Sequence, residues 1–193
     1  MSDLPHVDGV EHRFVRAGGL RMHVAEAGDP SKPPLLLLHG WPQHWYEWRH
    51  VVPLLAGDFR LVMPDLRGHG WTDAPDGPYD KEQLATDVLA LLDELGLERV
   101  SVLAHDWGAW VAFLIALRAP ERIDRMVLLN IPHPFQRPTL RKLAASWRFW
   151  YQWVIATPGL GASRPALRSD SPRSHQSESD AQQFLACLAV PDH

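Results

Sequence analysis

One aspartate lies at the junction between an apolar strand pattern and a helix pattern. Residues 100–104 are short and apolar, residues 107–118 have helical spacing, and Asp106 falls at the bend between them. Ala104 and Gly108, two positions away on either side, are small, as a tight strand-to-helix bend requires. A carboxylate at such a nucleophile elbow can attack a substrate carbon and form an ester. The alternative is that Asp106 only caps the helix that follows.

A second candidate motif supplies backbone N–H donors. It directly follows the apolar run 35–38 and consists of His39, Gly40, Trp41 and Pro42. A glycine turn at this point can direct an amide toward the space above the elbow. We expect the amides of Trp41 and Trp107 to form an oxyanion hole for the Asp106 carboxyl group. The alternative is an ordinary turn that ends the strand.

A third motif follows the strand predicted at Phe59–Met63. Its distinctive residues are Asp65, Arg67, Gly68 and Gly70. We interpret it as architectural, a glycine-rich bend whose charged pair ties loops together. Direct catalysis by Asp65 or Arg67 is the less favoured alternative.

Alternating strand and helix patterns predict the α/β class with a mostly parallel sheet. The pattern at residues 12–17 and 20–26 predicts a β-hairpin around Gly18-Gly19. The four leucines at 35–38 are typical of a strand buried on both faces. Further strands are predicted at 59–63, 100–104 and 126–129, and helices at 45–56, 81–95 and 107–118.

Composition narrows the possible partners. The chain has 193 residues with a formal net charge of −4, which argues against binding to nucleic acid or to an anionic membrane surface. No apolar run approaches the roughly 20 residues of a membrane-spanning helix. A single cysteine, Cys187, fits a reducing compartment, so we expect a cytoplasmic protein. Nine tryptophans predict an aromatic cavity or interface in addition to core packing.

Taken together, the segments HGWP, DLRGHGWTDAP, AHDWGAW and NIPHP resemble the α/β-hydrolase superfamily, in its epoxide hydrolase branch. The resemblance covers about residues 12–161. It implies an α/β-hydrolase core with an N-terminal hairpin, a small apolar epoxide or halide substrate, and no metal or organic cofactor. An aspartate at position 106 restricts the comparison to epoxide hydrolases and related dehalogenases.

Two positions favour epoxide hydrolases over dehalogenases. Haloalkane dehalogenases usually carry asparagine where this chain has Trp41, and fluoroacetate dehalogenases usually carry arginine where it has Trp107. By resemblance to the start of the lid in bacterial epoxide hydrolases, Tyr151 donates a hydrogen bond to the epoxide oxygen. Alternatively, Tyr151 belongs to an ordinary core-like aromatic stripe over 147–154. The motif residues His39 and His105 are interpreted as structural.

The resemblance implies a two-step reaction. Asp106 attacks an epoxide carbon while a tyrosine protonates the leaving oxygen, and water activated by a histidine then hydrolyses the ester. The family places its acid and its histidine after the lid. No residue of this sequence is identified for either role, nor is a second lid tyrosine, and His133 lies in a motif loop ahead of the lid.

We therefore expect three segments. Residues 1–145 form the front of an α/β-hydrolase domain, 146–161 begin the lid, and 162–193 are a disordered or non-native tail rich in serine and arginine. The hypothesis is a frameshift or premature stop near Gly161, with most of the lid and the last strands missing. The alternatives to an epoxide hydrolase are a haloalkane or haloacid dehalogenase-like hydrolase and a non-catalytic remnant.

Overall fold

The computed structural model describes residues 4–131. The strands are β1 (Val10–Ala17), β2 (Leu20–Ala27), β3 (Pro34–Leu38), β4 (Arg60–Pro64), β5 (Val100–His105) and β6 (Ile123–Leu129). The α-helices are α1 (Val52–Leu55), α2 (Lys81–Glu94) and α3 (Trp107–Arg118), and the 3₁₀ helices are η1 (Trp45–His50) and η2 (Pro120–Arg122). The lid segment, the tail and Tyr151 lie outside the described residues, so the predicted three-segment division remains a prediction.

The six strands form one sheet in the order β1-β2-β4-β3-β5-β6. β3 is parallel to both β4 and β5, and β5 is parallel to β6, whereas β2 is antiparallel to β1 and to β4. The predicted α/β class with an N-terminal hairpin is therefore confirmed. The hairpin turns at Gly18 and Gly19, whose φ angles of 55° and 83° suit the two-residue turns that match strand twist.

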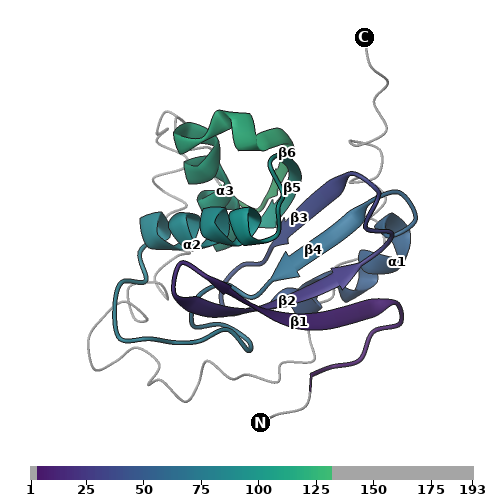
Figure 1. The fold of residues 1–193 in the computed structure, drawn as a ribbon, viewed down its shortest axis with the longest axis horizontal. Coiled ribbons are helices and arrows are strands. Elements are labelled where there is room, and N and C mark those ends of the chain that lie inside the picture. Colours follow the sequence, from purple (N-terminus) through teal and green to yellow (C-terminus); the bar gives the residue numbers. More distant parts are fainter. Residues whose placement is uncertain (1–3, 132–193) are drawn as a thin grey trace, which may run out of the picture.

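Both faces of the sheet are covered by helices (Figure 1). Leu36 and Leu38 face α2 and α3, and Leu35 and Leu37 face η1 and α1; all four are at most 1% exposed. The continuous apolar run thus serves two cores, one on each side of β3. The predicted amphipathic helix is α2, whose apolar face packs into the first core through Leu84, Val88, Leu91 and Leu92.

The helix predicted over 45–56 is interrupted. It divides into the 3₁₀ helix η1 and the single turn α1, with Pro53 in the first turn of α1. Proline has no N–H to donate, so continuous α-helical hydrogen bonding cannot pass through this position. The predicted buried face is nevertheless correct, because Trp45, Trp48, Val52 and Leu55 are each at most 2% exposed.

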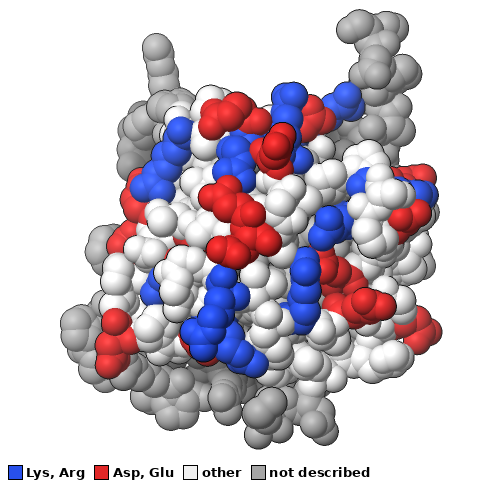
Figure 2. Space-filling model, viewed as in Figure 1, with Lys and Arg blue, Asp and Glu red and all other residues white. Residues whose placement is uncertain are grey.

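The surface carries mixed charge. On the face shown in Figure 2, lysine and arginine side chains are interspersed with aspartate and glutamate. Glu26 of β2, for example, pairs with Arg13 at 2.7 Å and with Arg60 at 3.0 Å elsewhere among the described charges. Within residues 4–131, no helix is long and apolar enough to cross a membrane.

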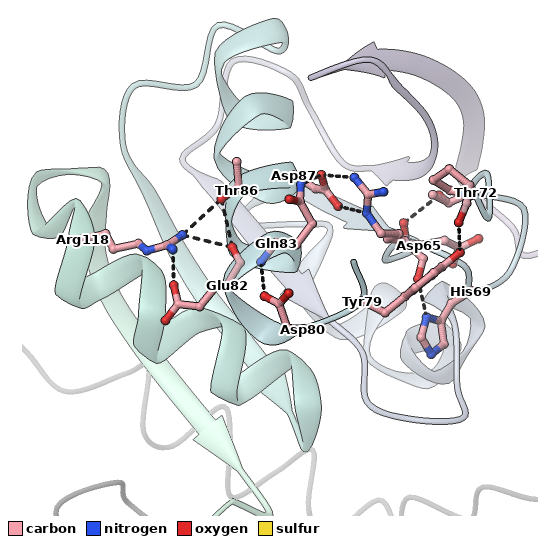
Figure 3. A network of polar contacts seen from close by, with 12 residues as sticks. Asp65, His69, Thr72, Tyr79, Asp80, Glu82, Gln83, Thr86, Asp87 and Arg118 are labelled. Carbon is pink, nitrogen blue, oxygen red and sulfur yellow. Dashed lines mark hydrogen bonds and ion pairs between the residues drawn. The ribbon is translucent and has the colours of Figure 1, made fainter. Parts of the chain in front are cut away.

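A buried ion pair fixes the third motif to α2. Arg67 forms two hydrogen bonds with Asp87, from Nε to Oδ2 at 2.6 Å and from a terminal nitrogen to Oδ1 at 2.8 Å. Gln83 also donates to Asp87 Oδ1, at 2.9 Å, as Figure 3 shows. Asp65 and Arg67, the two charged residues that were predicted to tie loops together, bond to different partners. Arg67 connects its loop to helix α2.

We expect Arg67→Met to lower the free energy of unfolding by about 3–5 kcal/mol, because the change leaves a buried carboxylate unpaired. The matched control is Arg118→Met. Arg118 of α3 pairs with Glu82 of α2, the helix that also carries Asp87 (Figure 3). Both Arg118 and Glu82 are exposed. The control should lower the free energy of unfolding by less than about 1 kcal/mol. Urea denaturation measures both values, and equal losses in the two variants would contradict the assigned role of the buried pair.

Candidate active site

The bend between β5 and α3 has the backbone of a strained elbow. Asp106 has φ 48° and ψ −116°, a conformation that costs of order 1–3 kcal/mol for a residue other than glycine. Its amide donates to the carbonyl of Leu129 in β6 at 3.1 Å, and its own carbonyl accepts from Ala109 and Trp110 in the first turn of α3. These bonds hold the strained residue between a strand and a helix.

The Asp106 side chain does not cap α3, although the residue occupies the N-cap position. Its Oδ2 instead accepts a hydrogen bond from the backbone amide of Trp41 at 3.1 Å. Trp41 follows β3, so the contact joins the carboxyl ends of two neighbouring parallel strands. Ligands bind at this edge of open α/β sheets.

Two glycines allow this approach. A Cβ atom on Gly108 would collide with the carbonyl oxygen of Leu38 and lie 2.6 Å from that of His39. A Cβ on Gly40 would lie 2.7 Å from the Asp106 Cβ and 3.0 Å from its Oδ2. Neither position has room for a larger side chain while the Trp41 amide remains on the carboxylate.

The residue that donates to the carboxylate and the residue that follows Asp106 are both tryptophans, and their rings lie close together. The rings of Trp41 and Trp107 have centroids 6.2 Å apart and planes inclined by 31°. The Trp41–Pro42 peptide is cis. Trp41, Asp106 and Trp107 are all half-buried, so the carboxylate is next to aromatic surface that still reaches solvent. A role for the Trp107 amide as the second oxyanion donor remains a prediction.

His39 is part of the frame around this edge. The neutral ring uses both nitrogens, because Nε2 accepts from the Leu66 amide at 2.9 Å and Nδ1 donates to the Gly40 carbonyl at 2.9 Å. Burial, reinforced by the nearby His69, lowers the pKa of His39 from 6.5 to about 3. His39 therefore stays uncharged near neutral pH and ties the second motif to the third.

Asp65 is a fully buried carboxylate that accepts hydrogen bonds from three separate segments of the chain. It accepts from the Trp45 amide at 2.8 Å, from the Trp71 amide at 3.0 Å and from His23 Nδ1 at 2.8 Å. Burial by itself would raise the pKa of the Asp65 carboxyl, but the hydrogen bonds from the His23 side chain and the Trp45 amide help to bring it below its ordinary value. Each contact belongs to the frame and none reaches Asp106.

The glycines of the third motif belong to the same loop. A Cβ on Gly70 would collide with the Asp65 carboxyl, and one on Gly68 would lie 2.6 Å from the Tyr79 ring. The structure thus brings together Asp106, Trp41, Trp107, Gly40 and Gly108. The third motif supports the loops around them and does not contact Asp106.

The sequence did not identify Glu47, a residue of η1 that lies beside His105, directly before the elbow. Glu47 is 6% exposed, and neither carboxyl oxygen has a hydrogen-bond partner among the described residues. The nearest basic atom is Nδ1 of His105, at 3.8 Å from Oε2, and that nitrogen also lies 3.3 Å from Oε1 of Gln43. Burial raises the pKa of Glu47, whereas contact with Glu47 raises the pKa of His105. In the sequence, the only signal was a carboxylate between two residues of a buried tryptophan face.

Lys81, the first residue of α2, was also missed. Its Nζ lies 2.9 Å from the centroid of the Trp107 ring. Burial lowers the pKa of Lys81 from 10.5 to about 8, and the charges of Asp106 and Asp80 oppose that shift. No sequence pattern marked this lysine, because it starts a helix 25 positions before Asp106 in the chain. Among residues 4–131, no group of three or more acidic, histidine or cysteine side chains is arranged to hold a metal ion.

Residues 33–175 match the family model described as alpha/beta hydrolase fold. The chain belongs to the α/β-hydrolase family. Within the family it lies in the epoxide hydrolase branch. It is 45% identical over 122 residues to a protein named soluble epoxide hydrolase from Corynebacterium sp. (strain C12), covering 63% of this chain and 42% of that protein. It is 39% identical over 153 residues to mouse epoxide hydrolase 4, and this match covers 76% of this chain and 43% of the mouse protein.

Solved structures support the same assignment. Epoxide hydrolase VrEH1 from Vigna radiata superposes with a TM-score of 0.67 at 40% identity, over 79% of this chain and 51% of that one. Cfl2 from Burkholderia cenocepacia superposes with a TM-score of 0.70 at 37% identity, over 82% of this chain and 55% of the Cfl2 chain. The chain spans about half the length of the relatives it matches.

We expect Gly108→Ala to lower the free energy of unfolding by more than about 2 kcal/mol, because the added methyl collides with the end of β3. Gly57→Ala is the matched control, since a Cβ at Gly57 meets nothing within 4 Å. This control should stay within about 1 kcal/mol of wild type. If Gly108→Ala proves as stable as the control in thermal or urea unfolding, the close approach of β3 and α3 is wrong.

We expect His39 to make the fold sensitive to acid. Because its folded-state pKa of about 3 is below the ordinary 6.5, the unfolded chain binds a proton that the folded chain does not. Stability is therefore lost as pH falls from about 6.5 toward 3, by up to about 1.4 kcal/mol per pH unit. His39→Gln keeps an acceptor for the Leu66 amide without titrating, and should flatten this dependence.

The measurement is the free energy of unfolding at several pH values between 7 and 4. His50→Gln, a change at an exposed histidine, serves as the control and should keep the wild-type slope. Parallel slopes for wild type and His39→Gln would show that His39 does not stay neutral in the folded protein.

Proposed function

We propose that the chain carries the nucleophile and oxyanion donors of an epoxide hydrolase-type reaction, in which Asp106 opens an epoxide through an ester intermediate. One observation carries this proposal: Asp106 lies on a strained elbow with Oδ2 held by the Trp41 amide at 3.1 Å, without capping its helix. A carboxylate used only as a cap would bond to the amides of α3 instead.

The two carboxyl oxygens then have different roles. The oxygen held by the Trp41 amide is fixed, which leaves Oδ1 to attack a ring carbon. Once the ester has formed, the held oxygen becomes its carbonyl oxygen. Negative charge gathers on that oxygen when water adds, and the Trp41 amide is already in place to stabilise it. The Trp107 amide is proposed as the second donor.

The surroundings suit a small apolar substrate. The rings of Trp41 and Trp107 lie close together on the two residues next to the carboxylate contact, and aromatic surface favours apolar groups. Several relatives carry the name epoxide hydrolase, which supports an epoxide as the substrate class. Tyr151 remains the proposed hydrogen-bond donor to the ring oxygen. A cytoplasmic location, inferred from the sequence, likewise remains a proposal.

The test follows the ester on the full 193-residue chain. Styrene oxide, a small apolar epoxide, is incubated with the protein, and mass spectrometry of peptides measures the adduct while chromatography measures the diol. We expect an adduct on Asp106, diol, or both. Asp106→Asn should lower adduct formation by at least about 10³-fold, because the amide is not a nucleophile.

Asp58→Asn is the matched control, since Asp58 is an exposed carboxylate just before β4, at the opposite edge of the sheet. It should react as wild type does. No adduct and no diol with the wild-type chain would contradict the proposal. Release of halide from a haloalkane with no reaction toward the epoxide would favour a dehalogenase.

A further inference from the structure

A second carboxyl group, that of Glu47, is buried next to the elbow without satisfying its own oxygens. Glu47 is 6% exposed, and neither oxygen accepts a hydrogen bond from the residues that the structure describes. An ionisable group buried in this way costs free energy of folding, because the water it loses is not replaced by hydrogen bonds. The stability of the fold therefore does not explain a carboxyl group at this position.

The 3₁₀ helix η1 fixes the place of this carboxyl group. Trp45 and Trp48, on either side of Glu47, are fully buried in the core on this side of the sheet. Asp65 also accepts a hydrogen bond from the Trp45 amide at 2.8 Å. Because close-packed cores resist such shifts, the carboxyl group cannot leave its neighbours without disturbing the packing of η1.

Two segments of the site meet at Glu47. His105, the residue before Asp106, has its Nδ1 3.8 Å from Glu47 Oε2. Gly40, the residue before Trp41, is the second neighbour. Burial is the main influence on the pKa of Glu47 and raises it, while His105 and the Gly40 amide act in the opposite direction. The residues that directly precede the two partners of the Trp41–Asp106 hydrogen bond thus both interact with one carboxyl group.

We propose that Glu47 is a positioning residue for the reaction of Asp106. Through its ion pair with His105 it holds the elbow against the turn at Gly40, so that the Trp41 amide stays on Oδ2 while Oδ1 attacks the epoxide. The inference rests on the proposed function of Asp106. The role of Glu47 is indirect, because its contact is with His105 and not with the reacting carboxyl group.

The charge of the Glu47–His105 pair suits this role. Burial raises the pKa of Glu47, and the contact with Glu47 raises the pKa of His105. The two residues therefore retain one proton between them more strongly than either would in water. A pair that holds this proton has no net charge, so it can brace the elbow without placing a second negative charge next to Asp106.

Gln43 allows the charge of Glu47 to be separated from its packing. The Oε1 atom of Gln43 lies 3.3 Å from Nδ1 of His105, the same nitrogen that faces Glu47. Gln43 belongs to the turn itself, since its amide donates to the Gly40 carbonyl at 3.0 Å. A carboxylate placed at position 43 would therefore also join the elbow to this turn through His105.

The test measures ester formation by the full 193-residue chain. Styrene oxide is added at several concentrations, and mass spectrometry of peptides gives the initial rate of the Asp106 adduct. Glu47→Gln keeps the shape of the side chain and removes its charge. We expect the maximal rate to fall about 10–10²-fold, because a misplaced nucleophile is less often aligned for attack. The half-saturating concentration of epoxide should stay unchanged, because substrate binding is not affected.

The melting temperature distinguishes positioning from a purely structural role. Glu47→Gln should not lower it, because the variant removes a buried charge that lacks hydrogen bonds. Glu11→Gln is the matched control: Glu11 is exposed on β1, at the far edge of the sheet, and the change should leave the rate of ester formation as in wild type.

Two double variants test how Glu47 acts. Adding Gln43→Glu to Glu47→Gln returns a carboxylate to His105 and should recover most of the lost rate, so the two changes are not additive. His105→Phe keeps a ring at this position but removes the nitrogen that Glu47 faces. In that background Glu47→Gln should cause no further loss, because the pair is already broken.

The outcomes separate this inference from the proposed function. A wild-type rate in Glu47→Gln would overturn the role of Glu47 and leave Asp106 as the nucleophile. A slower rate that comes with a lower melting temperature and is not restored by Gln43→Glu would also overturn it, since Glu47 would then only support the fold. If the wild-type chain forms neither adduct nor diol, the proposed function fails, and the positioning role fails with it.

Discussion

The hydrogen bond from the Trp41 amide to Asp106 Oδ2 is the contact on which the rest of the site depends. It forms only because β3 and β5 are adjacent parallel strands that end at the same level, Leu38 pairing with Ala104. The two glycines then let the segments after these strands approach more closely than side chains allow. The sheet order, the two bends and the position of the carboxylate are thus one geometric constraint.

The buried polar groups around this contact serve mainly to hold it. Asp65, His39 and Arg67 each satisfy backbone or side-chain partners from distant parts of the chain. Buried polar groups stabilise a fold only when such partners exist, because an unpaired one carries the full cost of desolvation. Satisfied in this way, they hold the loops against the sheet and α2, and the strain at Asp106 is maintained by the surrounding structure.

Local patterns predicted most of the fold. The leucine run, the amphipathic stripe of α2 and the Gly-Gly hairpin each encode an element within a few residues, and all three were located from the sequence. The break in the helix at Pro53, the partner of Arg67 and the burial of Glu47 could not be predicted in the same way. Each depends on groups brought together by the folded chain, such as Asp87, 20 residues from Arg67. The position of Lys81 on the Trp107 ring is of this kind too.

The distribution of charge around Asp106 follows from the same physics. A half-buried carboxylate needs donors or positive charge nearby, and here the Trp41 amide, the start of α3 and the Lys81 ammonium provide them. A second carboxyl, Glu47, lies behind the elbow beside His105. Burial raises the pKa of Glu47, and the negative charge of Asp106 raises it further. Both effects disfavour the charged form of Glu47, so the geometry that buries this carboxyl beside His105 also limits how much negative charge gathers next to Asp106.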